Sequence, residues 1–573
     1  MQLRQSNIDK LTRSTFDVLI VGGGINGAVS AAALAGRGVR TALIDMRDFA
    51  GFTSMQSSNL AWGGIKYLES HDYALVRELC KSRNRLMRNY PSTVEEIRFL
   101  TTVSAGFRFH PVFLWLGAWV YWLMGDCHTR VPRLLTRKDI EREEGIIDTR
   151  DCTGGIEYSD AYLHDNDARF TFNFVRSAMT SGCIAANYVE SLGGRRENGV
   201  WTIRARDTID GTEFTIRANV LINAAGPFVD AHNRLTGQTT EYHHVFSKGI
   251  HLLVDRVTPR RRVLAFFADD GRLFFAIPMG LKTCVGTTDT RVDEPIVRVS
   301  DDDVEFVLDN INKRLKLDDP LSRRDVVAYR CGVRPLAVKS EAAGKRDFLQ
   351  MSRKHALDVN LQDAHISIFG GKLTDCINVG DEVCGTVIKM GIGIPHPDYK
   401  WYGEPPDEMK QEFLHRARLM GLDAYTPPTS TEQLSTRLWR RYGLGALAML
   451  ESIREDARQA ELLIDGTEYI RCELHQAARR EMITKLEDFL RRRSKIALVL
   501  RKEDILRSEG LGEACSILFG DRARAKLEEY ARQDGDLAGL QPPAAPYEYI
   551  DRLSAESHAG NRAHSESLEW RAT

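Results

Sequence analysis

One histidine and three cations stand where side chains could act on an anionic alcohol. His251 lies in the middle of the apolar run at residues 248–254, KGIHLLV, and a histidine so placed can take the proton of a hydroxyl group. Arg334 precedes a proline that fixes the local backbone, and Arg353 and Lys372 lie in short turns beside strand-like runs. Arginine binds phosphate through paired hydrogen bonds, and lysine contributes a compact charge. A core histidine and exposed surface cations are the alternative roles of these residue types.

Oxidation of an alcohol needs a hydride acceptor, and residues 17–45 predict a site for a dinucleotide cofactor. An apolar run is followed by Gly22, Gly24 and Gly27 in the pattern G-x-G-x-x-G, and then by an alanine-rich stretch typical of a helix. Such glycines permit a tight turn close to a pyrophosphate, and Asp45 at the end of a second strand would accept hydrogen bonds from a ribose. A chance glycine-rich turn is the alternative, but it would not explain the flanking strand, helix and acid. Further cofactor contacts expected from this unit are Ile25, Asn26 and Met46.

Residues 48–68 are mostly small or hydroxyl-bearing, which is typical of a loop. Hydroxyl and amide side chains can bind phosphate or ribose, and paired glycines let the backbone lie against a flat ring. The cofactor contacts expected from this loop are Thr53, Ser54, Ser57, Ser58, Asn59, Trp62, Gly63 and Gly64. A solvated loop without ligand contacts is the equally supported alternative.

Two later segments repeat the arrangement of a buried strand that ends in small residues. The first is VLINAAGP at residues 220–227, which ends near Ala225 and Gly226. The second is ISIFGGK at residues 366–372, and its expected cofactor contacts are Gly371, Lys372, Leu373 and Thr374. Because the carboxyl ends of parallel strands meet at one edge of a sheet, these distant segments are expected to form one cofactor domain.

The glycine unit and the loop after it also carry a resemblance to a known family. Together they read G-x-G-x-x-G followed by F-x-x-x-T-S-x-x-S-S-x-L-x-x-G-G-x-x-Y-L, which resembles the FAD-dependent glycerol-3-phosphate dehydrogenases of the aerobic, respiratory type. The resemblance covers residues 15 to about 530, and further blocks follow in the order of the family. These blocks are 156–160 (IEYSD), 221–230 (LINAAGPFVD), 248–254 (KGIHLLV), 285–290 (VGTTDT), 332–336 (GVRPL), 352–355 (SRKH) and 366–374 (ISIFGGKLT).

The resemblance implies an α/β plus α fold: an FAD-binding Rossmann-like domain of the glutathione-reductase and D-amino-acid-oxidase type, a substrate domain with a mixed sheet, and a helical C-terminal domain. The oxidoreductase region would span residues 14–398, with an FAD-binding part at about 14–70, 150–230 and 330–398 and a substrate-binding part at about 71–149 and 231–329. Strand-like runs at 201–206, 250–254, 263–268, 273–277 and 283–287 predict an antiparallel sheet in the substrate part. Residues 405–535 would form the helical domain, and the composition of 540–573 predicts a disordered tail.

The same resemblance implies the reaction, which is FAD-dependent oxidation of sn-glycerol 3-phosphate to dihydroxyacetone phosphate. Hydride would pass to flavin N5, and the electrons would pass on to a membrane quinone. His251 would be the base, with Arg334 and Lys372 beside it in the catalytic set. The substrate would be bound by Lys66, Tyr67, Arg334, Arg353 and Lys372.

Two positions depart from the family pattern. Lys66 stands where the family usually has arginine, and Trp62 stands where it usually has a histidine close to the flavin. Lysine keeps the charge but loses the planar fork of arginine. Another phosphorylated or carboxylated secondary alcohol as substrate, or oxygen as electron acceptor, is therefore an open alternative. A flavin-binding interaction protein without catalysis is a third, against which the retention of His251 and the cations argues.

The composition bears on partners and compartment. The 573 residues carry 78 basic and 79 acidic side chains, so no overall positive field would attract nucleic acid. The 10 cysteines are scattered without a C-x-x-C pair, which predicts reduced thiols and no metal site. The first residues lack an apolar signal segment, so a cytoplasmic protein is expected. The sequence leaves the oligomeric state open, and a homodimer is compatible with it.

The apolar segment PVFLWLGAWVYWLM at residues 111–124 is too short to span a bilayer, which takes about 20 residues. On a helix, one face of this segment would consist of Val112, Trp115, Trp119 and Trp122. Because tryptophan favours the membrane interface, this face could dock on the inner face of the cytoplasmic membrane near a quinone pool; burial within the substrate domain is the alternative. The basic run at 491–493 is expected to be a solvated face, or else a contact with anionic lipid.

Overall fold

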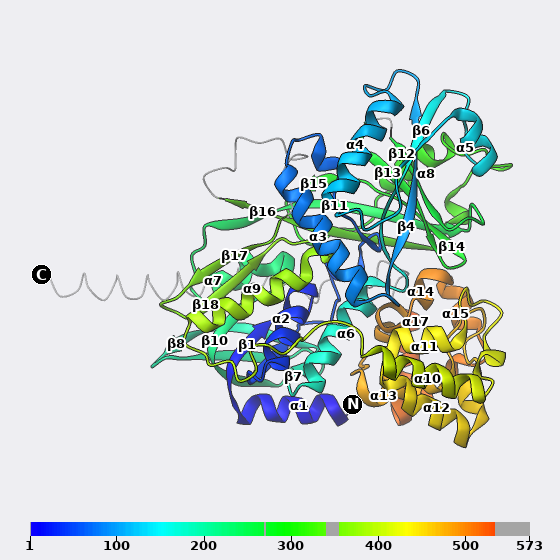
Figure 1. Ribbon diagram of the computed structural model, residues 1–573. Coiled ribbons are helices and arrows are strands. Elements are labelled where there is room, and N and C mark those ends of the chain that lie inside the picture. Colours follow the sequence, from blue (N-terminus) through cyan, green and yellow to red (C-terminus); the bar gives the residue numbers. More distant parts are fainter. Residues whose placement is uncertain (1, 269–270, 340–353, 533–573) are drawn as a thin grey trace, which may run out of the picture.

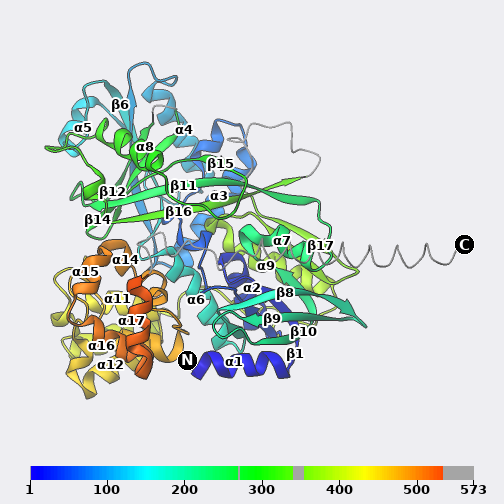
Figure 2. The same ribbon diagram turned by 180° about the vertical axis from the view of Figure 1, so that it is seen from behind.

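The computed structural model describes residues 2–268, 271–339 and 354–532. In this part of the chain, two β-sheets with their helices form the bulk of the molecule, and a separate helical domain, drawn in yellow and orange, lies beside them (Figures 1 and 2). The N-terminal helix lies along the edge of the first sheet region, close to the helical domain.

The first sheet has 8 strands: β1 (Thr15–Val21), β2 (Thr41–Ile44), β7 (Ile184–Ala186), β8 (Val189–Glu197), β9 (Val200–Asp207), β10 (Glu213–Asn223), β17 (Ala356–Asn360) and β18 (His365–Phe369). Strands β18, β10, β1, β2 and β7 lie side by side in that order and are parallel. β17 pairs antiparallel with β18, and the β8–β9 hairpin pairs antiparallel with the first half of β10.

Strand β1 is buried on both of its faces. Because successive side chains of a strand point to opposite faces, Val18 and Ile20 share a core with α2 (Ile25–Gly36), whereas Leu19 shares one with α1 (Gln2–Arg13). On the first face, α2 contacts both α6 (Asp167–Thr180) and α9 (Cys376–Lys389). The alanine-rich sequence of α2 permits this close packing, which fixes the glycine turn between β1 and α2.

The second sheet has 10 strands: β3 (Leu60–Ala61), β4 (Val94–Ser104), β5 (Arg133–Leu135), β6 (Cys152–Leu163), β11 (Tyr242–Asp255), β12 (Arg262–Phe267), β13 (Leu273–Met279), β14 (Lys282–Gly286), β15 (Thr290–Val292) and β16 (Ala328–Lys339). β4 and β12 are parallel and the other pairs are antiparallel, so the sheet is mixed.

Most of the strand predictions for this sheet are confirmed, since 250–254, 263–268, 273–277 and 283–287 fall in β11 to β14. The run at 201–206 is different: it forms β9, which belongs to the first sheet because it pairs with β10. Strands β6 and β16, which the sequence prediction assigns to the FAD-binding part, lie in the second sheet. Sheet membership depends on pairing between distant segments, which local patterns do not reveal.

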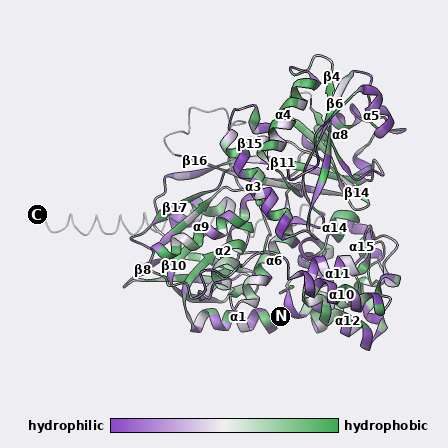
Figure 3. Ribbon diagram, viewed as in Figure 1, coloured by the Kyte–Doolittle hydropathy of each residue, from purple (hydrophilic) through white to green (hydrophobic). Residues whose placement is uncertain are grey.

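The helices of the second region are α3 (Tyr73–Asn89), α4 (Pro111–Met124), α5 (Arg137–Glu143) and α8 (Asp301–Asn312). Helix α4 has the predicted bounds, but of the predicted face only Val112 is exposed. The tryptophans are half-buried, and the Nε1 atom of Trp122 donates a hydrogen bond to the carbonyl oxygen of Thr129 at 2.6 Å. Besides Val112, the exposed apolar side chains of α4 are Phe113, Leu116, Val120 and Leu123. Docking through the tryptophan face stays a prediction, and Figure 3 shows α4 as an apolar helix at the outside of this region.

The helical C-terminal domain is confirmed. Its helices are α10 (Asp407–Leu419), α11 (Leu434–Tyr442), α12 (Gly445–Glu455), α13 (Arg471–Arg480), α14 (Ile496–Val499), α15 (Lys502–Arg507), α16 (Leu511–Phe519) and α17 (Ala523–Arg532). Across the described ranges, no helix is long and apolar enough to cross a bilayer. The predicted tail at 540–573 and Arg353 lie outside the described residues.

The basic run at 491–493 contradicts both sequence expectations, because it is neither a solvated face nor exposed to lipid. It ends a π-helical turn at Asp488–Arg493, and Arg491, Arg492 and Arg493 are 7%, 4% and 0% exposed. Buried charges need partners, and these arginines face carboxylates and carbonyl groups from other parts of the chain.

Candidate functional site

The glycine turn between β1 and α2 has the shape that a dinucleotide site requires. Gly22 has a φ of +106°, and a Cβ atom there would lie 2.3 Å from the carbonyl oxygen of Ala224. A Cβ atom at Gly27 would lie 1.8 Å from the carbonyl oxygen of Gly22. No side chain fits at either position, because both distances are far inside van der Waals contact. Gly24 is the N-cap of α2, so the positive end of this helix lies at the turn.

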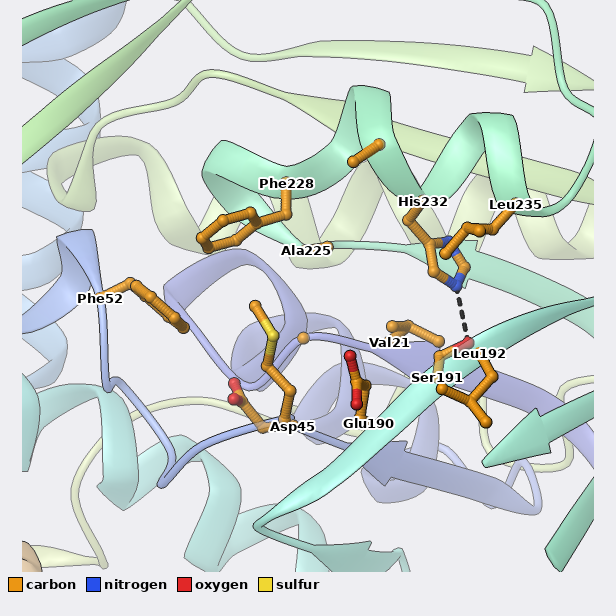
Figure 4. A pocket seen from close by; sticks show the side chains of 13 residues that line it. Val21, Asp45, Phe52, Glu190, Ser191, Leu192, Ala225, Phe228, His232 and Leu235 are labelled. Carbon is orange, nitrogen blue, oxygen red and sulfur yellow. Dashed lines mark hydrogen bonds between the residues drawn. The ribbon is translucent and has the colours of Figure 1, made fainter. Parts of the chain in front are cut away.

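A cavity of about 80 Å³ lies at the carboxyl ends of β1 and β2 (Figure 4). Gly22, Asp45 and Met46 line it from these strands, Ala225 lines it from the end of β10, and the remaining walls come mainly from β8 and α7 (Val229–Leu235). Parallel sheets bind dinucleotides at this edge, with the acid at the end of the second strand on the ribose. The cavity therefore matches the adenosine half of a dinucleotide.

Asp45 is buried and accepts two backbone hydrogen bonds. The N–H of Gly23 donates to its Oδ2 atom at 2.7 Å, and the N–H of Arg47 donates to its Oδ1 atom at 2.8 Å. Burial raises the pKa of Asp45 to about 7, against the lowering effect of these two bonds. Because each carboxylate oxygen has two lone pairs, Asp45 can still accept hydrogen bonds from ribose hydroxyls.

Residues that the sequence pattern does not single out complete the cavity. The rings of Phe52 and Phe228 meet edge to face at one end, with centroids 4.8 Å apart. At the other end, the Nε2 atom of His232 lies 2.8 Å from Ser191 Oγ, and burial lowers the pKa of His232 to about 4, so this ring is neutral. Glu190 adds a carboxylate to the wall. These residues come from β8, α7 and loops that approach β2 only through tertiary packing, so no local spacing predicts them.

The hydroxyl residues of the loop after β2 bond to the protein itself. Ser54 Oγ accepts a hydrogen bond from the N–H of Ile25 at 2.9 Å, and Thr53 Oγ1 donates to a carbonyl group of β16 at 3.0 Å. Ser57 Oγ accepts a hydrogen bond from the N–H of Asn59 at 3.1 Å. These bonds tie the loop to the start of α2 and to the second sheet. Direct contact of these side chains with the cofactor stays a prediction.

Further along this loop, the paired glycines are required by close packing. A Cβ atom at Gly63 would lie 2.2 Å from the hydroxyl oxygen of Tyr121. Gly64 has a φ of +81° and precedes the short 3-10 helix Ile65–Leu68. Ser58 is half-buried. The loop therefore follows a fixed path past the position predicted for the flavin.

The last glycine-bearing segment joins the first. Asn26 Nδ2 donates a hydrogen bond to the carbonyl oxygen of Gly370 at 3.0 Å, and Gly371, with a φ of +101°, lies against the same amide. Thr374, which belongs to the 3-10 helix Leu373–Asp375, donates a hydrogen bond from Oγ1 to the carbonyl oxygen of Trp62 at 3.3 Å. At the end of β10, Gly226 begins another 3-10 helix at a φ of +59°. The crowded glycines, the helix N-terminus at the turn and the cavity with Asp45 in its wall together fit FAD.

His251 lies in β11 with its ring buried, and neither ring nitrogen has a hydrogen-bond partner among the residues that the structure describes. Burial lowers the pKa of His251 to about 3, and the positive charges of Arg334 and Arg330 act in the same direction. The imidazole is therefore neutral near pH 7, the form in which one ring nitrogen carries an unprotonated lone pair. Arg330, which sequence patterns do not single out, pairs with His251 in the register of β16 against β11 and bonds to Asn59 Oδ1 at 3.0 Å.

Arg334 is fixed on the same sheet as His251. Its Nη2 atom donates a hydrogen bond to Thr287 Oγ1 at 2.9 Å, and its Nη1 atom donates to the carbonyl oxygen of Thr288 at 3.3 Å. Gly249 makes room for the guanidinium group, since a Cβ atom there would lie 2.3 Å from Nη2. The threonines belong to a block of the family resemblance, but their contact with Arg334 follows only from the fold.

Lys372 lies beside two aromatic residues of the segment that follows β3. Its Nζ atom is 4.3 Å from the ring centroid of Tyr67 and 5.7 Å from that of Trp62. A cation over a ring face is attracted by the electrons of the ring. The structure therefore brings these predicted residues together. The side chain of Lys66 is exposed, and the roles of Lys66 and Arg353 stay predictions.

Comparison with known proteins points to one family. A model of the FAD dependent oxidoreductase family matches residues 17–352, and a model of the C-terminal domain of alpha-glycerophosphate oxidase matches residues 407–507. The chain is 30% identical over 390 residues to the aerobic glycerol-3-phosphate dehydrogenase of Bacillus subtilis, covering 67% of this chain and 69% of that protein. It is 28% identical over 513 residues to the aerobic glycerol-3-phosphate dehydrogenase of Escherichia coli, covering 85% and 95%. It spans about half, 53%, of the bovine mitochondrial glycerol-3-phosphate dehydrogenase.

A solved structure shares the fold. The X-ray structure of the glycerol-3-phosphate dehydrogenase from Bacillus halodurans complexed with FAD superposes with a TM-score of 0.67 at 24% identity, covering 94% of this chain and 98% of that one. The predicted fold class is therefore confirmed. From the family models, the named relatives and the glycine cradle, we conclude that the chain belongs to the FAD-dependent glycerol-3-phosphate dehydrogenase family and uses FAD as its cofactor.

Proposed function

We propose that this enzyme oxidises sn-glycerol 3-phosphate to dihydroxyacetone phosphate. The observation that carries the proposal is a neutral, buried His251 with Arg334 fixed on the neighbouring strand, where its charge acts on the His251 ring. A secondary alcohol needs a base and a phosphate needs cations, and this arrangement can supply both. Relatives that bear the name of glycerol-3-phosphate dehydrogenase support the choice of substrate.

In the proposed reaction, Arg334 and Lys372 bind the phosphate group and so orient the carbinol carbon. A ring nitrogen of His251 takes the proton of the hydroxyl group while the same carbon loses hydride, and the product is a ketone. Bound FAD supplies the hydride acceptor at flavin N5. Further substrate contacts in this proposal are Lys66, Tyr67 and Arg353.

The electrons are proposed to pass to a membrane quinone, with α4 docked on the inner face of the cytoplasmic membrane. Residues 111–124 contain no charged side chain, and Phe113, Leu116, Val120 and Leu123 are between 45% and 59% exposed on one side of the helix. Burying such a face in the interface of a bilayer removes apolar surface from water. The half-buried tryptophans would then lie behind this face and would not be part of it.

A second candidate is oxidation of another phosphorylated or carboxylated secondary alcohol, or transfer of electrons to oxygen. Trp62 and Lys66 favour it. The Trp62 ring lies 5.7 Å from the Nζ atom of Lys372 and so narrows the space around this cation, and Lys66 cannot make the paired contact of an arginine. The domain matched at residues 407–507 takes its name from an oxidase.

The proposal is tested by anaerobic bleaching of the flavin absorbance with a panel of phosphorylated polyols and hydroxy acids. Preferential bleaching by sn-glycerol 3-phosphate supports it, and bleaching by another compound alone favours the second candidate. Lys66→Arg is an internal check, since it should preserve or improve turnover of sn-glycerol 3-phosphate if Lys66 contacts the phosphate. A quinone analogue or oxygen is then added to the reduced enzyme, and the compound that reoxidises the flavin is the acceptor. Reoxidation by oxygen would also yield hydrogen peroxide.

A further inference from the structure

We propose that the C-terminal helical domain is a functional part of the FAD site, through Arg491, Arg492 and Arg493. These arginines are positioning residues, which hold the loop at residues 48–56 in the form that contacts the glycine turn. The inference rests on the FAD dependence of the family and is independent of the substrate. It therefore stands or falls separately from the proposed reaction.

Asp48 is the centre of the contact between the C-terminal domain and this loop. Its carboxylate is fully buried and accepts two parallel hydrogen bonds from Arg493 and one from the Nε atom of Arg492, all at 2.7 Å. Asn187 Nδ2 donates a further bond at 2.9 Å. Although burial alone would raise the pKa of Asp48, the guanidinium groups of Arg493 and Arg492 lower it below its usual value. Paired contacts of this kind are among the strongest hydrogen bonds in proteins.

Both arginines are also fixed within their own domain. The Nη2 atom of Arg492 donates to Asp488 Oδ1 at 2.6 Å, and the Nη2 atom of Arg493 donates to the carbonyl oxygen of Glu481 at 3.0 Å. The positions of their guanidinium groups are therefore fixed, and their hydrogen bonds fix the position of the Asp48 carboxylate in turn.

Arg491 extends the contact to the other end of the loop. Its Nη2 atom donates a hydrogen bond to Gln56 Oε1 at 3.3 Å and another to the carbonyl oxygen of Tyr329 in β16 at 2.9 Å. The carbonyl oxygen of Arg491 in turn accepts a bond at 3.1 Å from Asn166, the N-cap of α6. The loop is thus held at its first residue and at its last by one short turn of the C-terminal domain.

Between these two ends, the loop touches the glycine turn directly. The N–H of Ala50 donates to the carbonyl oxygen of Gly23 at 3.0 Å, and Ser54 Oγ accepts a bond from the N–H of Ile25 at 2.9 Å. Ala50 has a φ of +60°, a conformation that residues other than glycine rarely adopt and that persists where the surroundings impose it. Release of Asp48 would therefore relax the loop and change the surface offered to the pyrophosphate.

The test is the affinity of the apoprotein for FAD, measured by quenching of flavin fluorescence. Both Arg492→Lys and Arg493→Lys keep the charge, but the first loses the Nε bond to Asp48 and the second loses the paired bonds. Each should raise the Kd for FAD about tenfold or more, as expected for loss of a charged hydrogen bond. The matched control is Arg437→Lys, since Arg437 is also fully buried and pairs with Glu473 at 2.7 Å within the C-terminal domain. Arg437→Lys should lower the unfolding temperature about as much as the two test variants do, and its Kd for FAD should stay within about twofold of the wild-type value.

Amide hydrogen exchange gives a second readout. In the apoprotein of Arg493→Lys, the amides of residues 48–56 should exchange faster than in wild type, and in Arg437→Lys they should not. An unchanged Kd in Arg492→Lys and Arg493→Lys, or an equal rise in Arg437→Lys, would mean that the domain contributes general stability alone, and would overturn the proposal. If the fully buried Arg493 does not tolerate replacement, Arg491→Gln provides the same comparison, and an unchanged Kd there counts against it equally.

Discussion

The Nζ atom of Lys372 lies 4.3 Å from the centre of the Tyr67 ring. This contact joins the turn after β18 to the 3-10 helix Ile65–Leu68, so two parts of the predicted substrate site are in contact. The ring face attracts the ammonium group only weakly compared with a phosphate dianion. A phosphorylated substrate would therefore be the stronger partner of Lys372.

Lys372→Met is expected to lower kcat/KM for sn-glycerol 3-phosphate roughly ten- to hundredfold. The reason is that a charge-assisted contact with phosphate is worth about 1.5–3 kcal/mol. Lys354→Met is the control, because Lys354 is an exposed lysine of the same region that pairs with Glu78 at 3.1 Å. Steady-state kinetics decide the matter, and an equal loss in both variants would remove Lys372 from the substrate site.

His251→Gln should lower kcat by a factor on the order of 10² to 10⁴ with little change in KM, because a base acts in the transition state. The variant should retain FAD, since no cofactor contact is assigned to His251. Rapid-mixing measurements of flavin reduction isolate this step. A raised KM with normal kcat would instead assign His251 to substrate binding.

Leu116→Glu and Leu123→Glu should each weaken binding to vesicles of anionic phospholipid and slow quinone reduction, while reduction of a soluble dye stays normal. Leu116 and Leu123 are 52% and 58% exposed on the apolar face of α4, and a carboxylate there opposes insertion into the interface. Leu419→Glu is the control, because Leu419 is 75% exposed in the C-terminal domain. Vesicle binding that is unchanged in folded variants would exclude this face as the docking surface.

The parts of this structure that depend on local sequence could be predicted closely. The alanine-rich stretch expected to be a helix is α2, and Gly22 and Gly27 lie where a Cβ atom would collide with the backbone. The apolar helix at 111–124 has its predicted bounds. Glycine spacing and apolar runs fix these features because they act within a few residues.

Contacts between distant segments could not be predicted in the same way. Helical spacing shows which residues of α4 share a face, but only the packing on the second sheet decides which face is exposed. The run at 491–493 suggested a solvated surface because charged side chains are rarely buried. It is buried because Asp48, far away in the sequence, supplies the opposite charge. Arg330 beside His251 follows from strand register in the same manner.

The stability of the folded protein should fall at alkaline pH because His355 loses its proton there. Its ring nitrogens lie 2.6 Å from Asp375 Oδ2 and 2.8 Å from Glu382 Oε2. Burial alone would lower the pKa of His355, but these two carboxylates raise it to about 9. A raised pKa means that the stabilisation is complete below the unfolded value of about 6.5 and is lost as the pH rises through about 9.

The unfolding temperature should therefore decrease between pH 7 and pH 10 in the wild type, by roughly 1 °C for each kcal/mol lost, because the unfolding entropy of a chain of 573 residues is about 1.2 kcal/mol/K. His355→Asn should unfold at a lower temperature and lack most of this dependence. Thermal unfolding at a series of pH values checks both statements. An identical slope in His355→Asn would assign the alkaline loss to another group.

The affinity for FAD should fall at acidic pH through Asp45. Its pKa is raised to about 7 by burial in the cavity that Figure 4 shows. Ribose hydroxyls bond more strongly to a carboxylate than to the neutral acid, so bound FAD favours the ionised form. The Kd of the apoprotein for FAD should therefore be roughly tenfold higher at pH 5.5 than at pH 8.5.

The stability of the apoprotein distinguishes weaker FAD binding from general acid denaturation, because Asp45 affects the two quantities in opposite directions. A carboxyl group with a raised pKa stabilises the fold below the unfolded value of about 4, and this contribution is lost as the pH rises through about 7. Acidification should thus weaken FAD binding while the Asp45 contribution to apoprotein stability increases. Asp45→Asn should bind FAD weakly with an almost flat pH dependence in fluorescence titrations. If the variant instead keeps the pH dependence of the wild type, a group other than Asp45 controls FAD binding.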